Sequence, residues 1–190
     1  MNNGKKNVGT IEIIMGCMFS GKTSYLLSYV DKMSSIGIKP LIINSHINTR
    51  DMIGTLTNHN NQQTCCITVK NLSDINFDIL NLHQYIFIDE GQFFEDLFDT
   101  VLFGCEKLCK NIYIFGLDGD FKRHKFGGIL DLIPYADKVK KLTGFCSLCN
   151  DMTPSLFTFR KSCDTEQTVI GNNDIYIPVC RKHYLMNIGV

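Results

Sequence analysis

Residues 16–23 read Gly16-Cys17-Met18-Phe19-Ser20-Gly21-Lys22-Thr23, which matches the phosphate-binding pattern G-x-x-x-x-G-K-[ST]. A β-rich run over 10–15 precedes this P-loop, and apolar residues at helical spacing over 23–33 follow it, so the motif has the context it requires. The glycines let successive N–H groups turn toward phosphates, and the helix aims its positive end at the same anion. The stretch therefore predicts a nucleotide site in which Lys22 reaches the β- and γ-phosphates and the Thr23 hydroxyl helps to hold Mg²⁺.

More strands are expected after this motif in the sequence. A helix is expected over 94–110. Apolar strands separated by helices predict a parallel sheet that is covered on both faces. The Asn- and Thr-rich stretch 44–63 is expected to be a long loop. The expected strands after the P-loop are 39–44, 84–89, 111–117 and 138–142.

Charge and cysteine content narrow the class of protein. Lys+Arg and Asp+Glu number 19 each, so the chain lacks the net basic charge that is typical of nucleic-acid binders. No apolar run reaches the roughly 18 residues of a membrane span, and the N-terminus does not read as a signal peptide. These features favour a cytoplasmic protein with no nucleic-acid or membrane partner. In such a chain, nine cysteines indicate thiols and a metal site rather than a disulfide framework.

Two pairs of metal-ligand residues share one spacing near the C-terminus. Residues 146–149 form a C-x2-C pair, and residues 180–183 form a C-x2-H pair. Three thiolates and one imidazole fill the tetrahedral shell of Zn²⁺, so we expect a structural zinc site rather than a catalytic one. The zinc would close residues 150–179 into a lasso, which is a natural lid over a substrate. The predicted ligands are Cys146, Cys149, Cys180 and His183.

Together these patterns predict an α/β fold with two parts. Residues 1–143 are expected to form a P-loop (RecA-like) domain, a parallel sheet with helices on both faces that binds the nucleotide. Residues 144–190 are expected to form a small zinc-binding domain that carries the lasso.

A P-loop enzyme also needs an acidic residue at the end of a neighbouring strand to hold Mg²⁺. The run 86–90 ends in Asp89 and Glu90, and Asp89 is the candidate for the metal. Glu90 is a candidate general base, but its position also suits a solvated loop carboxylate or a second partner for Mg²⁺. Arg50, in the polar loop, either stabilises the transferring phosphate or is simply solvated.

Several motif blocks, taken together, resemble the type II thymidine kinases, the zinc-containing class found in cells, bacteria and poxviruses. The similarity extends from about Thr10 to Tyr184, nearly the whole chain, and is far more specific than a P-loop alone. The blocks are M-F-S-G-K-T at 18–23, D-E-G-Q-F-F at 89–94, L-D-G-x-F-x-R at 117–123 and the two Cys/His pairs.

The resemblance implies transfer of the γ-phosphate of ATP to the 5′-hydroxyl of thymidine, with catalytic roles for Lys22, Glu90 and Arg50. It also implies a homotetramer that is inhibited by dTTP, with Mg²⁺ and Zn²⁺ as the metals. The residues expected around ATP and Mg²⁺ are Gly16, Cys17, Met18, Phe19, Ser20, Gly21, Lys22, Thr23, Asn48, Thr49, Arg50, Asp89, Glu90, Gly91 and Gln92. Those expected around thymidine are Met18, Gln92, Phe93, Leu117, Phe121, Thr158, Gln167, Thr168, Val169, Ile170, Gly171 and Tyr176.

Two departures from the family pattern bear on the site. Asn48 stands where many relatives have Asp, and Asp120 stands where Thr is common, which adds negative charge near the substrate. Two other functions share some of these motifs. A zinc-ribbon ATPase acting on nucleic acid would have a basic surface, which the balanced charge disfavours. A regulator that binds nucleotides without catalysis would have lost Lys22, Asp89 or Glu90, and all three are present.

Overall fold

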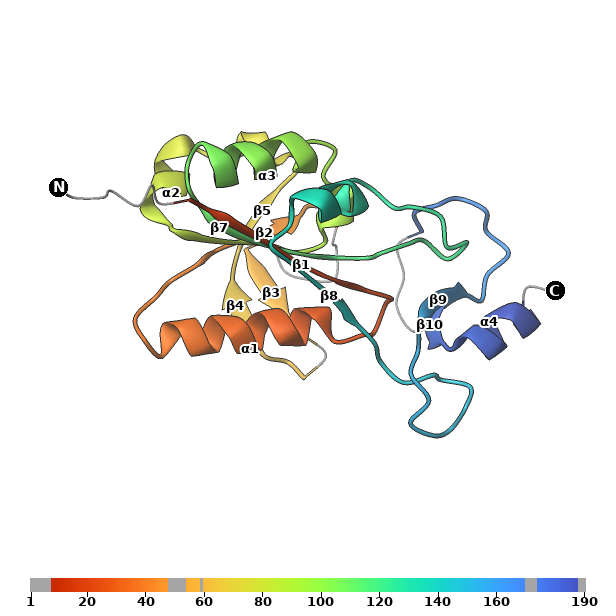
Figure 1. Cartoon of the computed structure of the whole chain (residues 1–190). Helices are drawn as coiled ribbons and strands as arrows, with labels where there is room; N and C mark the ends of the chain where they lie inside the picture. Colours follow the sequence, from red (N-terminus) through yellow and green to blue (C-terminus); the bar gives the residue numbers. More distant parts are fainter. Residues whose placement is uncertain (1–7, 48–53, 59, 170–173, 188–190) are drawn as a thin grey trace.

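A six-stranded parallel sheet forms the centre of the computed structural model, which describes residues 8–47, 54–58, 60–169 and 174–187 (Figure 1). The strands lie in the order β5-β2-β6-β7-β1-β8, and every neighbouring pair is parallel. The strand that leads into the P-loop, β1, therefore has a partner on each side. The bounds are β1 Thr10–Gly16, β2 Leu41–Ser45, β5 Ile67–Val69, β6 Tyr85–Ile88, β7 Asn111–Gly116 and β8 Lys138–Leu142.

Helices cover both faces of this sheet, as expected. Helix α1 (Lys22–Ser34) lies on one face, and α2 (Phe77–Leu82) and α3 (Leu97–Glu106) lie on the other (Figure 1). Three short 3-10 helices connect the elements of the α3 side. They are η1 (Leu72–Asp74), η2 (Gly91–Phe93) and η3 (Ile129–Tyr135).

The alternation of side chains along each strand builds two separate cores. On β1, Ile13 belongs to the core beneath α3, whereas the next residue, Ile14, belongs to the core beneath α1. On β6, Phe87 faces α1 and Ile88 faces α3. All four side chains are buried, which explains why these strands read as continuous apolar runs.

Two expectations about local structure were wrong. The stretch expected to be a loop contains β3 (Thr55–Thr57), which pairs antiparallel with β4 (Gln63–Cys65). Leu56 explains the difference, because it is 1% exposed and anchors this hairpin in the core beneath α1. The helix expected over 94–110 is also shorter, since the extended residue Phe94 and a turn at 95–96 precede α3, which ends at Glu106.

A smaller unit follows β8. Strands β9 (Phe157–Arg160) and β10 (Tyr176–Val179) pair antiparallel, and α4 (Arg181–Asn187) packs beside them with its own apolar cluster. Both strands belong to the lasso, and residues 161–169, the described segment that follows β9, form the lasso tip. Among the described helices, none is long and apolar enough to cross a membrane.

Candidate active site

The P-loop joins β1 to α1 at the carboxyl edge of the sheet. Gly21 adopts a left-handed conformation with φ of +83°, which favours glycine because it has no side chain. A Cβ atom at Gly16 would lie 2.4 Å from the carbonyl oxygen of Leu142 on β8. Both glycines are therefore required by the backbone path of the loop.

Lys22 is the cation of this loop, and its side chain is buried. Its Nζ donates to the carbonyl oxygens of Gly16 at 3.1 Å and Cys17 at 2.8 Å. Burial lowers the pKa of Lys22 below its usual range, and the nearby carboxylates of Glu90 and Asp89 act in the opposite direction. The loop thus holds its cation against main-chain oxygens, close to two acidic side chains.

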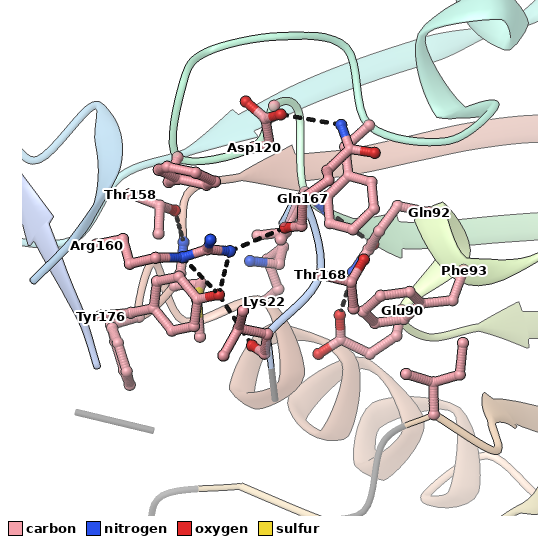
Figure 2. A pocket seen from close by; sticks show the side chains of 18 of the residues that line it. Lys22, Glu90, Gln92, Phe93, Asp120, Thr158, Arg160, Gln167, Thr168 and Tyr176 are labelled. Atoms are coloured by element: carbon pink, nitrogen blue, oxygen red, sulfur yellow. Dashed lines mark hydrogen bonds between the residues drawn. The ribbon is translucent and has the colours of Figure 1, made fainter. Parts of the chain in front are cut away.

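Those acidic side chains follow β6. Asp89 is 2% exposed, and its N–H donates to the carbonyl of Ile43 on the neighbouring strand at 2.8 Å. Glu90 has φ of +52°, a conformation that side-chain-bearing residues adopt rarely and at a cost of about 1 to 3 kcal/mol. Such strain persists where the surrounding structure imposes it, and here it turns the Glu90 carboxylate toward the pocket (Figure 2).

Gln92 fixes the position of this carboxylate. Its Nε2 donates to Glu90 Oε2 at 2.6 Å, while its Oε1 accepts from the N–H of Leu117 at 3.0 Å. Because Gln92 is 4% exposed and bonded at both ends, its amide has one orientation. The end of β6 and the end of β7 are thereby joined behind Glu90.

One pocket connects the P-loop to the lasso (Figure 2). Aromatic side chains form part of its wall, with Phe93 packed edge-on against Phe126 at 5.4 Å between ring centroids. The lining contains most of the described residues that the sequence predicted for the site. These are Met18, Phe19, Gly21, Lys22, Thr23, Glu90, Gln92, Phe93, Leu117, Phe121, Thr158, Gln167, Thr168, Val169 and Tyr176.

Other predicted residues lie elsewhere. Five of the described ones do not line the pocket, and they are Gly16, Cys17, Ser20, Asp89 and Gly91. Gly91 instead packs against the sheet, where an added Cβ would lie 3.0 Å from Ile114. Five further predicted residues fall outside the described part of the chain, namely Asn48, Thr49, Arg50, Ile170 and Gly171.

The lasso tip is organised by Arg160, which the sequence did not single out. Its guanidinium donates to the carbonyl oxygens of Asp164, Glu166 and Gln167, and twice to the hydroxyl of Tyr176, at 3.1 and 2.7 Å. The Tyr176 hydroxyl in turn donates to the carbonyl of Val169 at 2.9 Å. The ring of Phe121 lies 3.6 Å from the guanidinium carbon. A single buried cation therefore shapes the main chain of the tip.

Other lining residues were also missed as site residues. They include Ser24, Ile47, Gly119, Asp120 and Phe126. Asp120 was noted only as a departure from the family pattern, and its partners are described below. One signal for Phe126 was present in the sequence, because it follows the L-D-G-x-F-x-R block closely.

The P-loop and the lasso also contact each other directly. The N–H of Met18 donates to Thr158 Oγ1 on β9 at 3.0 Å. The buried Cys17 thiol lies 3.6 Å from Ser155 Oγ. These contacts hold the P-loop and the start of the lasso in a fixed position relative to each other.

The four predicted zinc ligands form a cluster in which all ligand atoms lie within 4.8 Å of one another. Cys149 Sγ and Cys180 Sγ are 3.7 Å apart, and His183 Nδ1 lies 3.3 to 3.5 Å from the three sulfurs. A tetrahedral Zn²⁺ bound at about 2.3 Å separates two sulfurs by about 3.8 Å, so the geometry fits this ion.

The thiols of the cluster share their protons. Burial raises the pKa of Cys146, but hydrogen bonds from the backbone of Cys180 and Leu148 and with the side chains of His183 and Cys149 outweigh that effect, so its pKa is lowered to about 6. The pKa of Cys149 is raised to about 11 by burial and by its hydrogen bonds with Cys146 and Cys180. The cluster also reaches the pocket wall, because the Tyr184 hydroxyl, one residue after His183, donates to the carbonyl of Phe121 at 2.8 Å.

Comparison with known proteins agrees with this geometry. A family model described as "Thymidine kinase" matches residues 9–184. Thymidine kinase a of Arabidopsis thaliana is 37% identical over 187 residues, which cover 96% of this chain and 78% of the plant protein. A thymidine kinase of Oryza sativa subsp. japonica is 40% identical over 183 residues, covering 93% and 66%. A thymidine kinase of Monkeypox virus is 35% identical over 182 residues, covering 94% and 98%.

Proposed function

Because this chain belongs to the thymidine kinase family, we propose that it transfers the γ-phosphate of ATP to the 5′-hydroxyl of thymidine. The observation that supports this best is the single pocket that Lys22 and Thr23 of the P-loop share with Glu90 and with the lasso. An ATP site, a carboxylate and an acceptor site thus open into one space, as direct phosphate transfer requires.

On the phosphate side, Lys22 neutralises charge on the β- and γ-phosphates, and the N–H groups of the P-loop bind their oxygens. The hydroxyl of Thr23 and the carboxylate of Asp89 are hard oxygen donors that suit Mg²⁺. When bound, Mg²⁺ supplies further positive charge to the transferring phosphoryl group. Arg50 is proposed to contribute charge to the same group, as the resemblance implies.

Glu90 is proposed as the general base that accepts the proton of the 5′-hydroxyl as its oxygen attacks the γ-phosphorus. The hydrogen bond from Gln92 supports this role, because it fixes one carboxylate oxygen of Glu90 at the pocket. The positive φ of Glu90 places its Cα where the side chain reaches the pocket.

The nucleoside is proposed to lie beneath the lasso. Main-chain atoms of residues 167–171 would bind the edge of the thymine ring, as the resemblance implies. Met18 and Thr158 would lie near its methyl group, while Phe93, Leu117, Phe121 and Tyr176 enclose the rest. A small pocket around the 5-position excludes purines on steric grounds.

The remaining expectations belong to the same proposal. Residues 1–143 form the nucleotide-binding domain, and residues 144–190 carry a structural Zn²⁺ on Cys146, Cys149, Cys180 and His183. The metal would fix the base of the lasso rather than react. The resemblance also supports a cytoplasmic homotetramer that is inhibited by dTTP.

A panel of acceptors tests the proposed reaction. The protein is incubated with ATP and Mg²⁺ together with thymidine, deoxyuridine, deoxycytidine or deoxyadenosine, and the monophosphates are separated by chromatography. We expect dTMP as the main product, with some dUMP. Product from deoxycytidine or deoxyadenosine alone would refute the assignment.

A further inference from the structure

Asp120 is held rigidly at the edge of the pocket. Its Oδ1 accepts from the N–H groups of Lys122 and His124, at 2.9 and 2.8 Å, so the carboxylate closes the turn formed by residues 118–125. The side chain is 3% exposed, and its second oxygen, Oδ2, points toward the lasso tip (Figure 2). The turn thus presents a fixed, charged acceptor to the segment opposite.

Gln167 meets this acceptor from the lasso tip. Its Nε2 donates to Asp120 Oδ2 at 2.9 Å and lies 3.3 Å from the carbonyl oxygen of Lys125. Both Asp120 and Gln167 line the pocket, so this hydrogen bond bridges two loops over the same space. A hydrogen bond to a carboxylate is stronger than one between neutral groups.

This contact differs in kind from those of Arg160. The guanidinium donates to main-chain carbonyls within the lasso and meets the turn only by stacking on the ring of Phe121, so all its hydrogen bonds lie within the lasso. Gln167 and Asp120 join two segments that are 47 residues apart in sequence. Lys122 makes a second link between the turn and the tip, since its Nζ donates to the carbonyl oxygen of Thr165 at 3.1 Å, but Lys122 is exposed whereas Asp120 is buried.

We propose that the Gln167–Asp120 hydrogen bond is a latch that holds the lasso tip closed over the nucleoside, and that Asp120 is a positioning residue acting through Gln167. This inference rests on the proposed function, because it assigns the acceptor site to the nucleoside. The latch slows nucleoside release while leaving the ATP side of the pocket unaffected.

Two substitutions that exchange the donor and the acceptor of this hydrogen bond test this role. Gln167→Glu places two carboxylates in contact, so the latch opens and KM for thymidine rises by about tenfold. In the double variant Asp120→Asn/Gln167→Glu, the introduced amide donates to the introduced carboxylate. Its oxygen still accepts from Lys122 and His124, and KM returns to within about threefold of the original value. KM for ATP stays within about twofold in both variants.

The matched control is Ser162→Glu, which adds the same charge to the exposed part of the lasso tip. A second readout needs no catalysis, namely hydrogen–deuterium exchange of the 161–169 amides in the nucleotide-free protein. Exchange should accelerate in Gln167→Glu and slow again in the double variant, while Ser162→Glu resembles the original chain. Circular dichroism checks that each variant is folded.

The latch is overturned if Gln167→Glu changes KM and exchange no more than Ser162→Glu does, or if the double variant is as impaired as the single one. Failure of the proposed function looks different, because the unsubstituted chain would then make no dTMP. In that case the exchange measurement still decides whether the hydrogen bond holds the lasso tip.

Discussion

The pocket has a P-loop wall, formed by residues 18–24, and a lasso wall, formed by residues 158–176 of the described chain. The main chain of both walls is held by a buried cation, but the two walls are attached to the rest of the fold differently. In each, a buried cation binds main-chain carbonyls, with Lys22 bonded to Gly16 and Cys17, and Arg160 bonded to the lasso tip. The P-loop, however, continues directly from β1, which has a strand on either side. The lasso tip is attached through one two-stranded sheet, a Cys/His cluster and a few side chains.

This difference predicts how substitutions divide between the two walls. Substitutions on the P-loop wall should lower the rate of phosphate transfer rather than loosen the wall, because the central sheet holds this wall in place. Substitutions on the lasso wall should weaken nucleoside binding, because single side chains such as Arg160 and Gln167 hold this wall in place. The experiments below test this division, beginning with the largest expected effect.

Lys22→Met removes the cation from the phosphate side. We expect kcat/KM to fall by about 10³-fold or more, since charge on the transferring phosphoryl group loses a direct partner. Thymidine binding, measured by calorimetry, should change little. Lys32→Met, an exposed position on the same helix, is the control. A fall in thymidine affinity as large as the fall in kcat/KM would contradict the proposed difference between the two walls.

Glu90→Gln removes the proposed base but keeps a similar shape. We expect kcat to fall by about 10²-fold, because the amide cannot accept the proton, while KM for both substrates changes little. Initial rates at saturating substrate measure this effect, with Glu95→Gln as an exposed control. Near-normal turnover would rule out Glu90 as the base.

Cys149→Ser removes one thiolate from the predicted zinc site. We expect purified protein to lose its zinc and thymidine affinity to fall by more than about tenfold, since the base of the lasso is no longer fixed. Metal analysis and calorimetry measure the two effects. Cys163→Ser, an exposed thiol in the lasso tip, should keep zinc. A folded, active protein without zinc would contradict the assignment.

Arg160→Lys retains the charge but loses the planar fork that bonds several carbonyls at once. We expect KM for thymidine to rise by about fivefold and KM for ATP to stay constant. Arg181→Lys, on the exposed side of α4, serves as the comparison. If both Michaelis constants rose together, Arg160 would support the whole pocket rather than the lasso wall alone.

The sequence predicted most of the sheet, because the central strands β2, β6 and β7 are largely buried on both faces. Runs such as 86–88 and 112–115 are apolar without interruption, and the P-loop has a strong local signature. Strands β3, β4 and β5 were missed because each of them has only three residues and lies in a polar stretch of the sequence. Their positions depend on tertiary contacts, such as the burial of Leu56.

Site prediction divided in a similar way. The Cys/His pairs and the P-loop could be found because their chemistry requires a fixed spacing. Arg160 could not, since three of its partners are main-chain carbonyls, which exist at every residue, and the Tyr176 hydroxyl lies 16 residues away in sequence. The Asp120–Gln167 bond was equally hidden, because it depends on how two distant loops meet.

The hydrogen bond from Tyr184 to Phe121 joins segments that are synthesised at different times. The P-loop and all six strands of the sheet emerge from the ribosome before β10 and α4 do. The phosphate side of the pocket is therefore synthesised while the acceptor side still lacks Tyr176, Cys180 and Tyr184. A nascent chain at that stage has its P-loop complete before it has the proposed lid over the acceptor site.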